Sequence, residues 1–280
     1  IIQKSPAPGD FCVIRTKFEG QDLQLFKKGT SSAEKFTLAF WVKSSKTGTH
    51  IVELFDIDNS RTVSQAYTIS SADTWEKIVV NFPADTTGAF GDDNGRSLDI
   101  QFWLGAGSNF TSGTLQTTWA GQTNANRIVG QVNLADNTSN NWYITGVQLE
   151  VGEFSSTTIP PFQHESFGDN LARCQRYFVR YANENQALGT FSYYSSGRVE
   201  AGISFPVTMR TSPSIVVTSG SGYHRVQRAN GDNNLNDFTL GNAGTTTCTL
   251  FNTDEASGTA GDAGLGYTRG SGFVSFNAEL

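Results

Sequence analysis

The sequence predicts an all-β protein of two domains, and three observations carry that prediction. Only 16% of the 280 residues are charged and 29 are glycine, whereas soluble domains commonly carry about 25% charged residues. Short stretches in which apolar and polar residues alternate recur along the chain, as in strands with one buried face. Clusters of Gly, Asn, Asp and Thr separate them and are typical of tight turns. The chain is long enough for two β-sandwich or jelly-roll domains.

The first half of the chain contains the clearest alternation. In residues 36–43, Phe, Leu, Phe and Val alternate with Thr, Ala, Trp and Lys, so that Trp41 lies on the polar face. Residues 98–104 repeat the pattern, with Trp103 on the polar face. Further predicted strands are residues 51–57, 77–82, 128–134 and 142–151. These segments predict an N-terminal jelly-roll domain over residues 1–152.

Residues 153–176 are a predicted hinge between the two domains. Pro160 and Pro161 favour extended backbone. Asp169 is predicted to cap one short helical turn over residues 170–175. We therefore expect at most one short helix in the chain.

The C-terminal part, residues 177–280, predicts a second β-sandwich domain. A strand over residues 177–181 begins it. The later predicted strands are residues 190–194, 198–207, 214–219, 237–240, 247–251 and 272–280. The tract 252–272 is rich in Gly, Asp, Ala and Thr and predicts a mobile loop.

Composition excludes several classes of partner. The net charge is −6 and there is no basic run, so we expect no nucleic-acid binding. No apolar stretch approaches the roughly 20 residues that span a bilayer. Three distant cysteines, Cys12, Cys174 and Cys248, predict neither a disulfide framework nor a zinc site. The first residue is Ile1 rather than Met, so we expect a processed or partial product that lacks an upstream segment.

Segments from both halves resemble one known class of protein. FTLAFWVKSSKTGTH (36–50), DTWEKIVVNFPADTTG (73–88) and YITGVQLEVG (143–152) resemble an N-terminal, carbohydrate-binding-like jelly roll of bacteriophage tail-fibre and virion surface proteins. LARCQRYF (171–178), FPVTMRTSPSIVV (205–217) and FNAEL (276–280) resemble the C-terminal fibre module of the same proteins. The resemblance implies a non-enzymatic virion protein, often a homotrimer, on a tail, fibre or capsid exterior. It supplies no binding residues.

Residues that could support catalysis or hold a metal are few. The paired carboxylates considered for glycoside hydrolysis are Glu53 with Asp56 and Asp58, and Asp92 with Asp93. Asp is common in Gly-flanked turns for its backbone hydrogen bonds alone, and no GxSxG motif accompanies the three histidines. Residues 56–60 offer oxygen ligands for calcium but lack the Gly and distal Glu of an EF-hand loop. We expect no enzyme, no cofactor and no metal site.

A few aromatic and polar residues are the candidates for ligand binding. An exposed Trp can stack on a sugar ring and donate its indole N–H. The same residues also suit a second core, a covering loop or a subunit interface, and both interpretations remain open. The candidates are Trp41, Trp103, Trp119, Tyr223, His224 and Arg225.

Three functional hypotheses follow. The first is a fibre-like bacteriophage virion protein, a homotrimer with other virion proteins as partners, which contacts a host surface glycan through many weak sites. The second is the carbohydrate-binding module of a secreted bacterial glycoside hydrolase. The third is a capsid decoration protein without receptor binding.

Overall fold

The computed structural model describes residues 5–229 and 231–280, and it confirms the all-β fold class. The chain folds as two compact units, with the boundary between Gln163 and His164. That boundary lies inside the predicted hinge, residues 153–176. We call the part before it unit 1 and the part after it unit 2. None of the helices in the described residues is long and apolar enough to cross a membrane.

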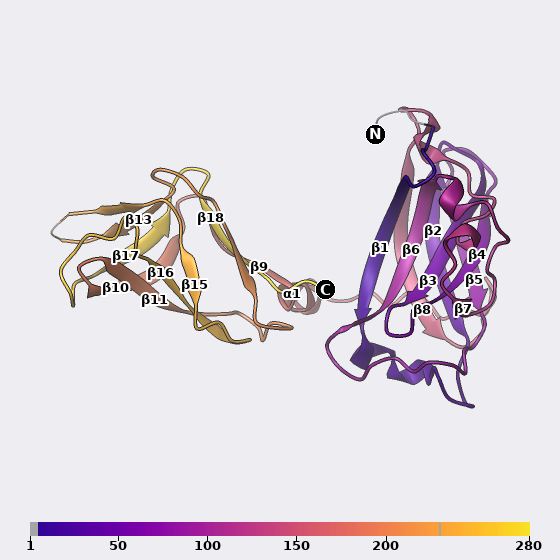
Figure 1. The fold of residues 1–280 in the computed structure, drawn as a ribbon, viewed down its shortest axis with the longest axis horizontal. Coiled ribbons are helices and arrows are strands. Elements are labelled where there is room, and N and C mark those ends of the chain that lie inside the picture. Colours follow the sequence, from indigo (N-terminus) through magenta and orange to yellow (C-terminus); the bar gives the residue numbers. More distant parts are fainter. Residues whose placement is uncertain (1–4, 230) are drawn as a thin grey trace. The chain divides into compact units, whose positions relative to one another are not determined.

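Unit 1 is a sandwich of two antiparallel sheets (Figure 1). The larger sheet contains, in spatial order, β1 (Phe11–Glu19), β6 (Arg96–Ala106), β3 (Gly48–Asp56), β4 (Arg61–Ile69) and β7 (Ala120–Gly121). The smaller sheet contains β5 (Glu76–Phe82), β2 (Phe36–Ser44) and β8 (Trp142–Val151). The 3-10 helices of this unit are η1 (Gly20–Phe26), η2 (Ser108–Phe110), η3 (Asn124–Asn126) and η4 (Leu134–Asp136).

The core of unit 1 lies between the two sheets. Leu38 and Phe40 of β2 face Leu54 of β3 and Ile100 of β6, and all four side chains are buried. The rings of Phe40 and Phe102 meet edge to face, with centroids 5.1 Å apart. The predicted alternation of residues 36–43 and 98–104 is thereby confirmed.

The predicted strands of unit 1 differ from the structure in two ways. Residues 128–134 form turns that lead into η4 and are not a strand. Ile128 of this segment is buried against Ile51 of β3 and Trp103 of β6. Strands β1, β4 and β7 were not predicted. β1 is a mostly exposed edge strand with weak alternation, and β7 has only two residues, whereas β4 is an interior strand of the larger sheet.

Unit 2 is also built of two antiparallel sheets. The larger contains β14 (Asn233–Leu235), β13 (His224–Gln227), β17 (Ala263–Thr268), β10 (Ala187–Ser195), β11 (Arg198–Ser204), β16 (Thr247–Asn252) and β15 (Thr239–Gly241). The smaller contains β12 (Ser214–Val217), β18 (Phe273–Asn277) and β9 (Phe178–Asn183).

The prediction of a loop over residues 252–272 is wrong for its central part. Strand β17 lies inside this tract and pairs with both β10 and β13. Its glycines have a packing role, because a Cβ on Gly266 would lie 2.3 Å from the ring of Phe191. The glycine content therefore reflects close packing rather than a loop.

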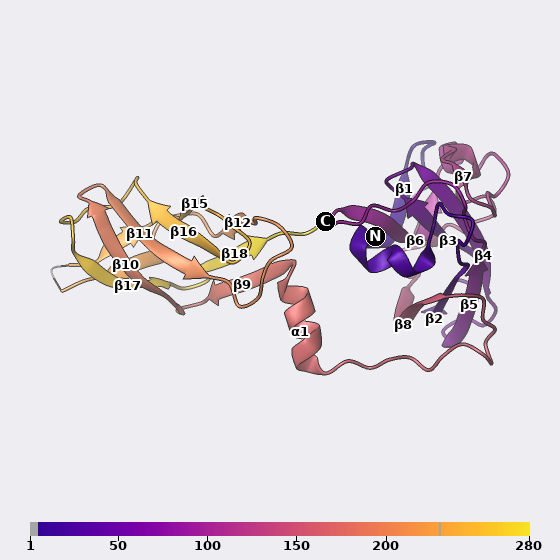
Figure 2. The same cartoon turned by 90° about the horizontal axis from the view of Figure 1, so that it is seen from below.

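The α-helix of the described residues, α1 (Phe167–Gln175), begins earlier than predicted (Figure 2). Ser166, not Asp169, is its N-cap: Ser166 Oγ accepts a hydrogen bond from the Asp169 backbone N–H at 3.2 Å. Asp169 accepts one in return from the Ser166 hydroxyl at 2.7 Å. Ser166 thus caps the helix through its side chain, and the Asp169 carboxylate also favours the helix N-terminus.

Candidate functional site

The outer side of the smaller sheet of unit 1 carries the candidate site. In β2 the residues Phe36, Leu38, Phe40 and Val42 point into the core. Alternation along a strand therefore turns the residues between them outward. These outward residues are Thr37, Ala39, Trp41 and Lys43.

Lys43 lies at the centre of a row that crosses all three strands. It pairs with Tyr143 of β8. Trp75 directly precedes β5, whose first residue Glu76 pairs with Val42, so Trp75 flanks Lys43 on the other side. Lys43 Nζ lies 4.9 Å from the ring centroid of Tyr143 and 5.5 Å from that of Trp75. These distances are those of cation–π contacts.

Trp41 lies at the centre of the adjacent row. It pairs with Lys77 of β5 and Thr145 of β8. Beside it β8 contains a bulge at Gly146, whose φ of +59° is a conformation that glycine adopts without strain. A Cβ on Gly146 would lie 3.3 Å from Trp41 Cδ1. The absence of a side chain at Gly146 thus leaves room for the indole.

The remaining half of this side is covered by the segment that follows β8. The Phe154 backbone N–H donates to Thr37 Oγ1 at 3.1 Å, and Gln148 Nε2 donates to the Pro160 carbonyl at 3.1 Å. Ala39 is buried beneath it. The cover ends at the Ala39 row and leaves the rows of Trp41 and Lys43 bare.

We call the bare surface the aromatic face. Its three rings are each more than two-fifths exposed: Trp41 43%, Trp75 42% and Tyr143 49%. Trp41 was predicted as a candidate from its alternating strand, whereas Trp75 and Tyr143 were not, because only the strand register brings the three rings together. The aromatic face consists of Trp41, Lys43, Trp75, Lys77, Tyr143 and Thr145.

Trp103 does not belong to an exposed site. It points away from the sandwich core, as predicted, but it is only 1% exposed. The loops after β6 cover it with Phe110 and Ile128. Its Nε1 donates to the buried carboxylate of Glu53 at 3.1 Å. A small second core on the outer side of the larger sheet therefore accounts for Trp103.

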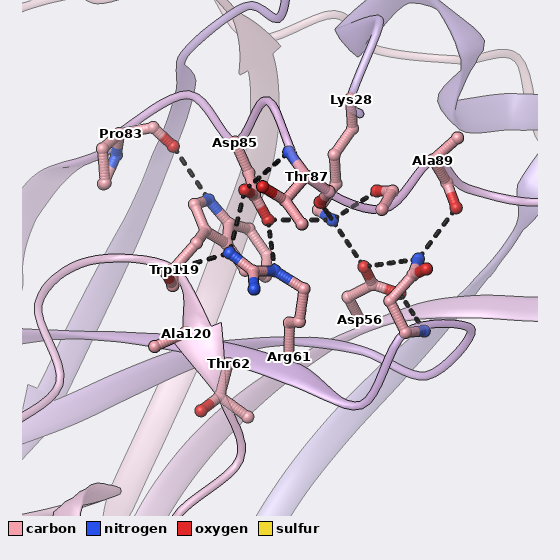
Figure 3. A network of polar contacts seen from close by, with 12 residues as sticks. Lys28, Asp56, Arg61, Thr62, Pro83, Asp85, Thr87, Ala89, Trp119 and Ala120 are labelled. Carbon is pink, nitrogen blue, oxygen red and sulfur yellow. Dashed lines mark hydrogen bonds and ion pairs between the residues drawn. The ribbon is translucent and has the colours of Figure 1, made fainter. Parts of the chain in front are cut away.

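Trp119 is likewise a core residue, and Figure 3 shows its surroundings. The side chain is buried, and its ring centroid lies 6.0 Å from that of Phe36. Its Nε1 donates to the Pro83 carbonyl at 2.8 Å. The indole N–H is thus already satisfied inside unit 1, and Trp119 is not available to a ligand.

The carboxylates beside Trp119 are bound by cationic side chains (Figure 3). Lys28 Nζ donates to Asp56 Oδ2 at 2.5 Å and to the Gly88 carbonyl at 2.7 Å. It also lies 3.0 Å from Asp85, which receives two hydrogen bonds from Arg61 at 2.8 and 3.0 Å. A lysine ammonium therefore lies among the oxygens considered for calcium. The described residues contain no group of three or more His, Cys, Asp or Glu that could hold a metal ion.

Glu53 is bound in the same way. Arg127 donates to both of its carboxylate oxygens, at 2.9 and 2.6 Å, and the side chain is fully buried. Burial raises the pKa of Glu53, and the Arg127 contacts lower it. Asp93 instead accepts the Gly95 backbone N–H at 2.8 Å in an exposed turn. Both arrangements are those of structural carboxylates.

The candidates of unit 2 do not form a joint site. His224 is fully buried, and its Nε2 lies 2.8 Å from the Thr218 carbonyl. Arg225 forms an ion pair with Asp232 at 2.7 Å. Tyr223 is half-buried and packs against Gly220, where a Cβ would lie 3.0 Å from its ring. Each of the three has a local structural partner.

No protein-family model and no curated protein matches the chain. Two solved structures of discoidin II from Dictyostelium discoideum share 12% and 11% identity with it. They cover 90% and 88% of this chain and 76% and 72% of their own, with TM-scores of 0.20 and 0.15. Scores this low carry no argument about fold or function.

Proposed function

We propose that unit 1 binds carbohydrate through the aromatic face. The observation that carries the proposal is the arrangement of Trp41, Trp75 and Tyr143, three exposed rings on the bare half of one sheet. Large aromatic side chains are usually buried or at interfaces, and a cluster of exposed ones marks a binding surface.

The chemistry of the aromatic face suits sugar rings. The flat faces of Trp and Tyr pack against the C–H face of a sugar, while the indole N–H and phenolic O–H can donate hydrogen bonds at the edge. Thr145 adds an exposed hydroxyl beside Trp41. An open sheet surface, unlike a closed pocket, accommodates an extended glycan chain.

Binding without catalysis is part of the proposal. Its support is that Glu53 and Asp56, the carboxylates considered for hydrolysis, are buried and bound by Arg127 and Lys28. A general acid must reach the glycosidic oxygen of its substrate.

A place on the exterior of a bacteriophage virion is supported by the sequence resemblance alone. In that setting a homotrimer repeated on one particle would combine weak sites into firm attachment to a host glycan. Light scattering of the purified chain tests the oligomeric part. A mass of three chains is expected, and a monomer would favour the carbohydrate-module alternative.

The test of the proposed function compares binding to immobilised glycans. Wild type is screened on a glycan array, and the best ligand is titrated against Trp41→Ala, Trp75→Ala and Tyr143→Ala. Each variant should weaken binding about tenfold or more, which corresponds to about 1.4 kcal/mol. Tyr194→Ala is the matched control, because Tyr194 is 74% exposed but lies in unit 2.

Two results would reject the proposal. The first is unchanged glycan binding by all three variants. The second is a change of sedimentation mass caused by the same substitutions without any glycan binding by wild type. The latter would show that the aromatic face is an interface between protein chains.

A further inference from the structure

We infer that the glycan bound at the aromatic face is an anionic polysaccharide, whose acidic groups are bound by Lys43 and Lys77. The inference rests on the proposed carbohydrate-binding function and names its substrate class. It follows from how the lysines of unit 1 are distributed between paired and unpaired positions.

Other lysines of unit 1 form ion pairs with carboxylates, and these pairs lie away from the aromatic face. The ion pairs are Lys27 with Glu34, Lys28 with Asp56 and Asp85, Lys35 with Glu153, and Lys46 with Asp136. Within residues 5–229 and 231–280, no carboxylate pairs with Lys43 or Lys77. The aromatic face therefore carries two uncompensated positive charges on a chain whose net charge is −6. Such a local positive potential attracts an anion.

Lys77 and Lys43 are both close neighbours of Trp41 on the outer side of the sheet. Lys77 is the cross-strand neighbour of Trp41, and the Cβ atoms of such neighbours lie about 5 Å apart. Lys43 lies two residues after Trp41 on the same side of β2, so that their Cα atoms are about 7 Å apart. A sugar ring stacked on Trp41 would thus have a cationic side chain within reach on two sides.

Lys43 is held in position before a ligand arrives. Its ammonium lies between the rings of Tyr143 and Trp75, which restrict a side chain that otherwise loses considerable rotamer entropy on binding. An ammonium has three N–H donors, and those not directed at a ring can donate hydrogen bonds to a ligand. This preorganisation favours a charged oxygen over a neutral hydroxyl.

Two acidic side chains near the aromatic face accept hydrogen bonds from groups outside it. Glu76 Oε1 accepts the backbone N–H groups of Ser70 and Ser71, at 2.9 and 2.7 Å. Glu150 Oε1 accepts Gln148 Nε2 at 2.7 Å in the half of the sheet covered by residues 153–160. Of these two carboxylates, Glu76 belongs to the row of the core-facing Val42 and Glu150 to the covered half of the sheet, so neither belongs to the aromatic face.

The experiment uses matched charged and neutral polymers. Polygalacturonate, alginate and hyaluronan are each compared with the same polymer after chemical reduction of its carboxyl groups, by affinity electrophoresis of the whole chain. At least one acidic polymer should bind, and its reduced form should bind about tenfold more weakly. Raising NaCl from about 25 to about 300 mM, which shortens the Debye length from about 20 to about 6 Å, should weaken only the acidic form.

Substitutions assign the effect to the two lysines. The double variant Lys43→Gln/Lys77→Gln should lose about tenfold in affinity for the acidic polymer and most of the salt dependence. Lys43→Arg/Lys77→Arg should retain both. Lys27→Gln is the matched control, because Lys27 is exposed and paired with Glu34 elsewhere in unit 1. Thermal unfolding checks that all variants are folded.

The outcomes separate this inference from the proposed function. Equal binding to the acidic and reduced polymers, or binding to neutral glycans alone, overturns the anionic class and leaves carbohydrate binding standing. Binding to no polymer and to no glycan of the array overturns both. An equal loss of acidic and neutral binding in the double glutamine variant overturns the role given to the charges, since the lysines would then only support the rings.

Discussion

Lys28 and Asp56 form an ion pair in the interior of unit 1, with Nζ and Oδ2 2.5 Å apart and neither side chain exposed to solvent. The ammonium also faces the rings of Phe90 and Trp119, at 5.2 and 5.0 Å from their centroids. A buried charge is stable only where partners replace water. The pair therefore joins the segment after η1 to the end of β3.

We expect Lys28→Met to destabilise unit 1 by about 3–5 kcal/mol, because Asp56 would remain buried without its cation. Urea unfolding followed by Trp fluorescence measures the change. Lys27→Met is the control: Lys27 has an exposed side chain, and an exposed pair contributes less than about 1 kcal/mol. Equal losses for the two variants would contradict the structural role of the buried pair.

The cysteines allow a direct test of burial in both units. Cys12 and Cys174 are exposed, whereas Cys248 is buried, and burial raises the pKa of the Cys248 thiol to about 11. Because the thiolate is the reactive form, a thiol reagent at neutral pH should modify two cysteines per folded chain and three after denaturation. Cys248→Ala should leave the native count at two. Three rapidly reacting thiols in the folded protein would show that the core around β16 is open.

Gly146→Ala should affect both stability and ligand binding. The positive φ of Gly146 costs a side-chain-bearing residue about 1–2 kcal/mol, and the new Cβ would press on Trp41. We expect a loss of stability of that size, a shift in Trp fluorescence and weaker glycan binding. Gly121→Ala in β7 is the control, because nothing lies within 4 Å of its added Cβ. If Gly146→Ala were as stable as wild type, the positive φ at this bulge would not require glycine.

Alternation of residue types was sufficient to predict the fold class and the orientation of several side chains. The pattern of residues 36–43 correctly turned Trp41 outward, and that of residues 98–104 correctly turned Trp103 away from the sandwich core. Exposure did not follow from orientation. Loops after β6 bury Trp103, and such long-range covering leaves no periodic signal in the strand itself.

The composition of the candidate site was only partly predictable. Trp75 and Tyr143 are 68 residues apart in sequence (143 minus 75) and meet only through the pairing of β5 and β8 with β2. The bulge at Gly146 also shifts the register of β8 between the Ala39 and Trp41 rows, and a single sequence does not specify where a strand slips by one residue. The buried positions of Trp119 and His224 were also missed, because short turn-rich segments show no alternation that would indicate which side chains are buried.

His224 should make the stability of unit 2 depend on pH. Its Nε2 donates to the Thr218 carbonyl, and its buried Nδ1 has no hydrogen-bond partner in the described structure. Protonation would place a second N–H where nothing accepts it. Burial lowers the pKa of His224, although the Thr218 contact and the charge of Asp237 act in the opposite direction.

The direction of that dependence follows from the lowered pKa. Unfolded His224 binds a proton below about pH 6.5, whereas the folded form stays neutral until a lower pH. Between the two values the unfolded state holds more protons, so the free energy of unfolding falls as the pH falls, by at most about 1.4 kcal/mol per pH unit. The loss should stop below the folded pKa, where both states are protonated.

Urea unfolding between pH 5 and pH 8 measures this slope. The unfolding of unit 2 is followed by the exposure of the buried Cys248 thiol to a thiol reagent. His224→Gln keeps a donor for the Thr218 carbonyl and cannot be protonated, so it should flatten the profile. His164→Gln is the matched control, because His164 is exposed at the start of the same unit. A profile that stays steep in His224→Gln would assign the pH dependence to another group and remove His224 as its source.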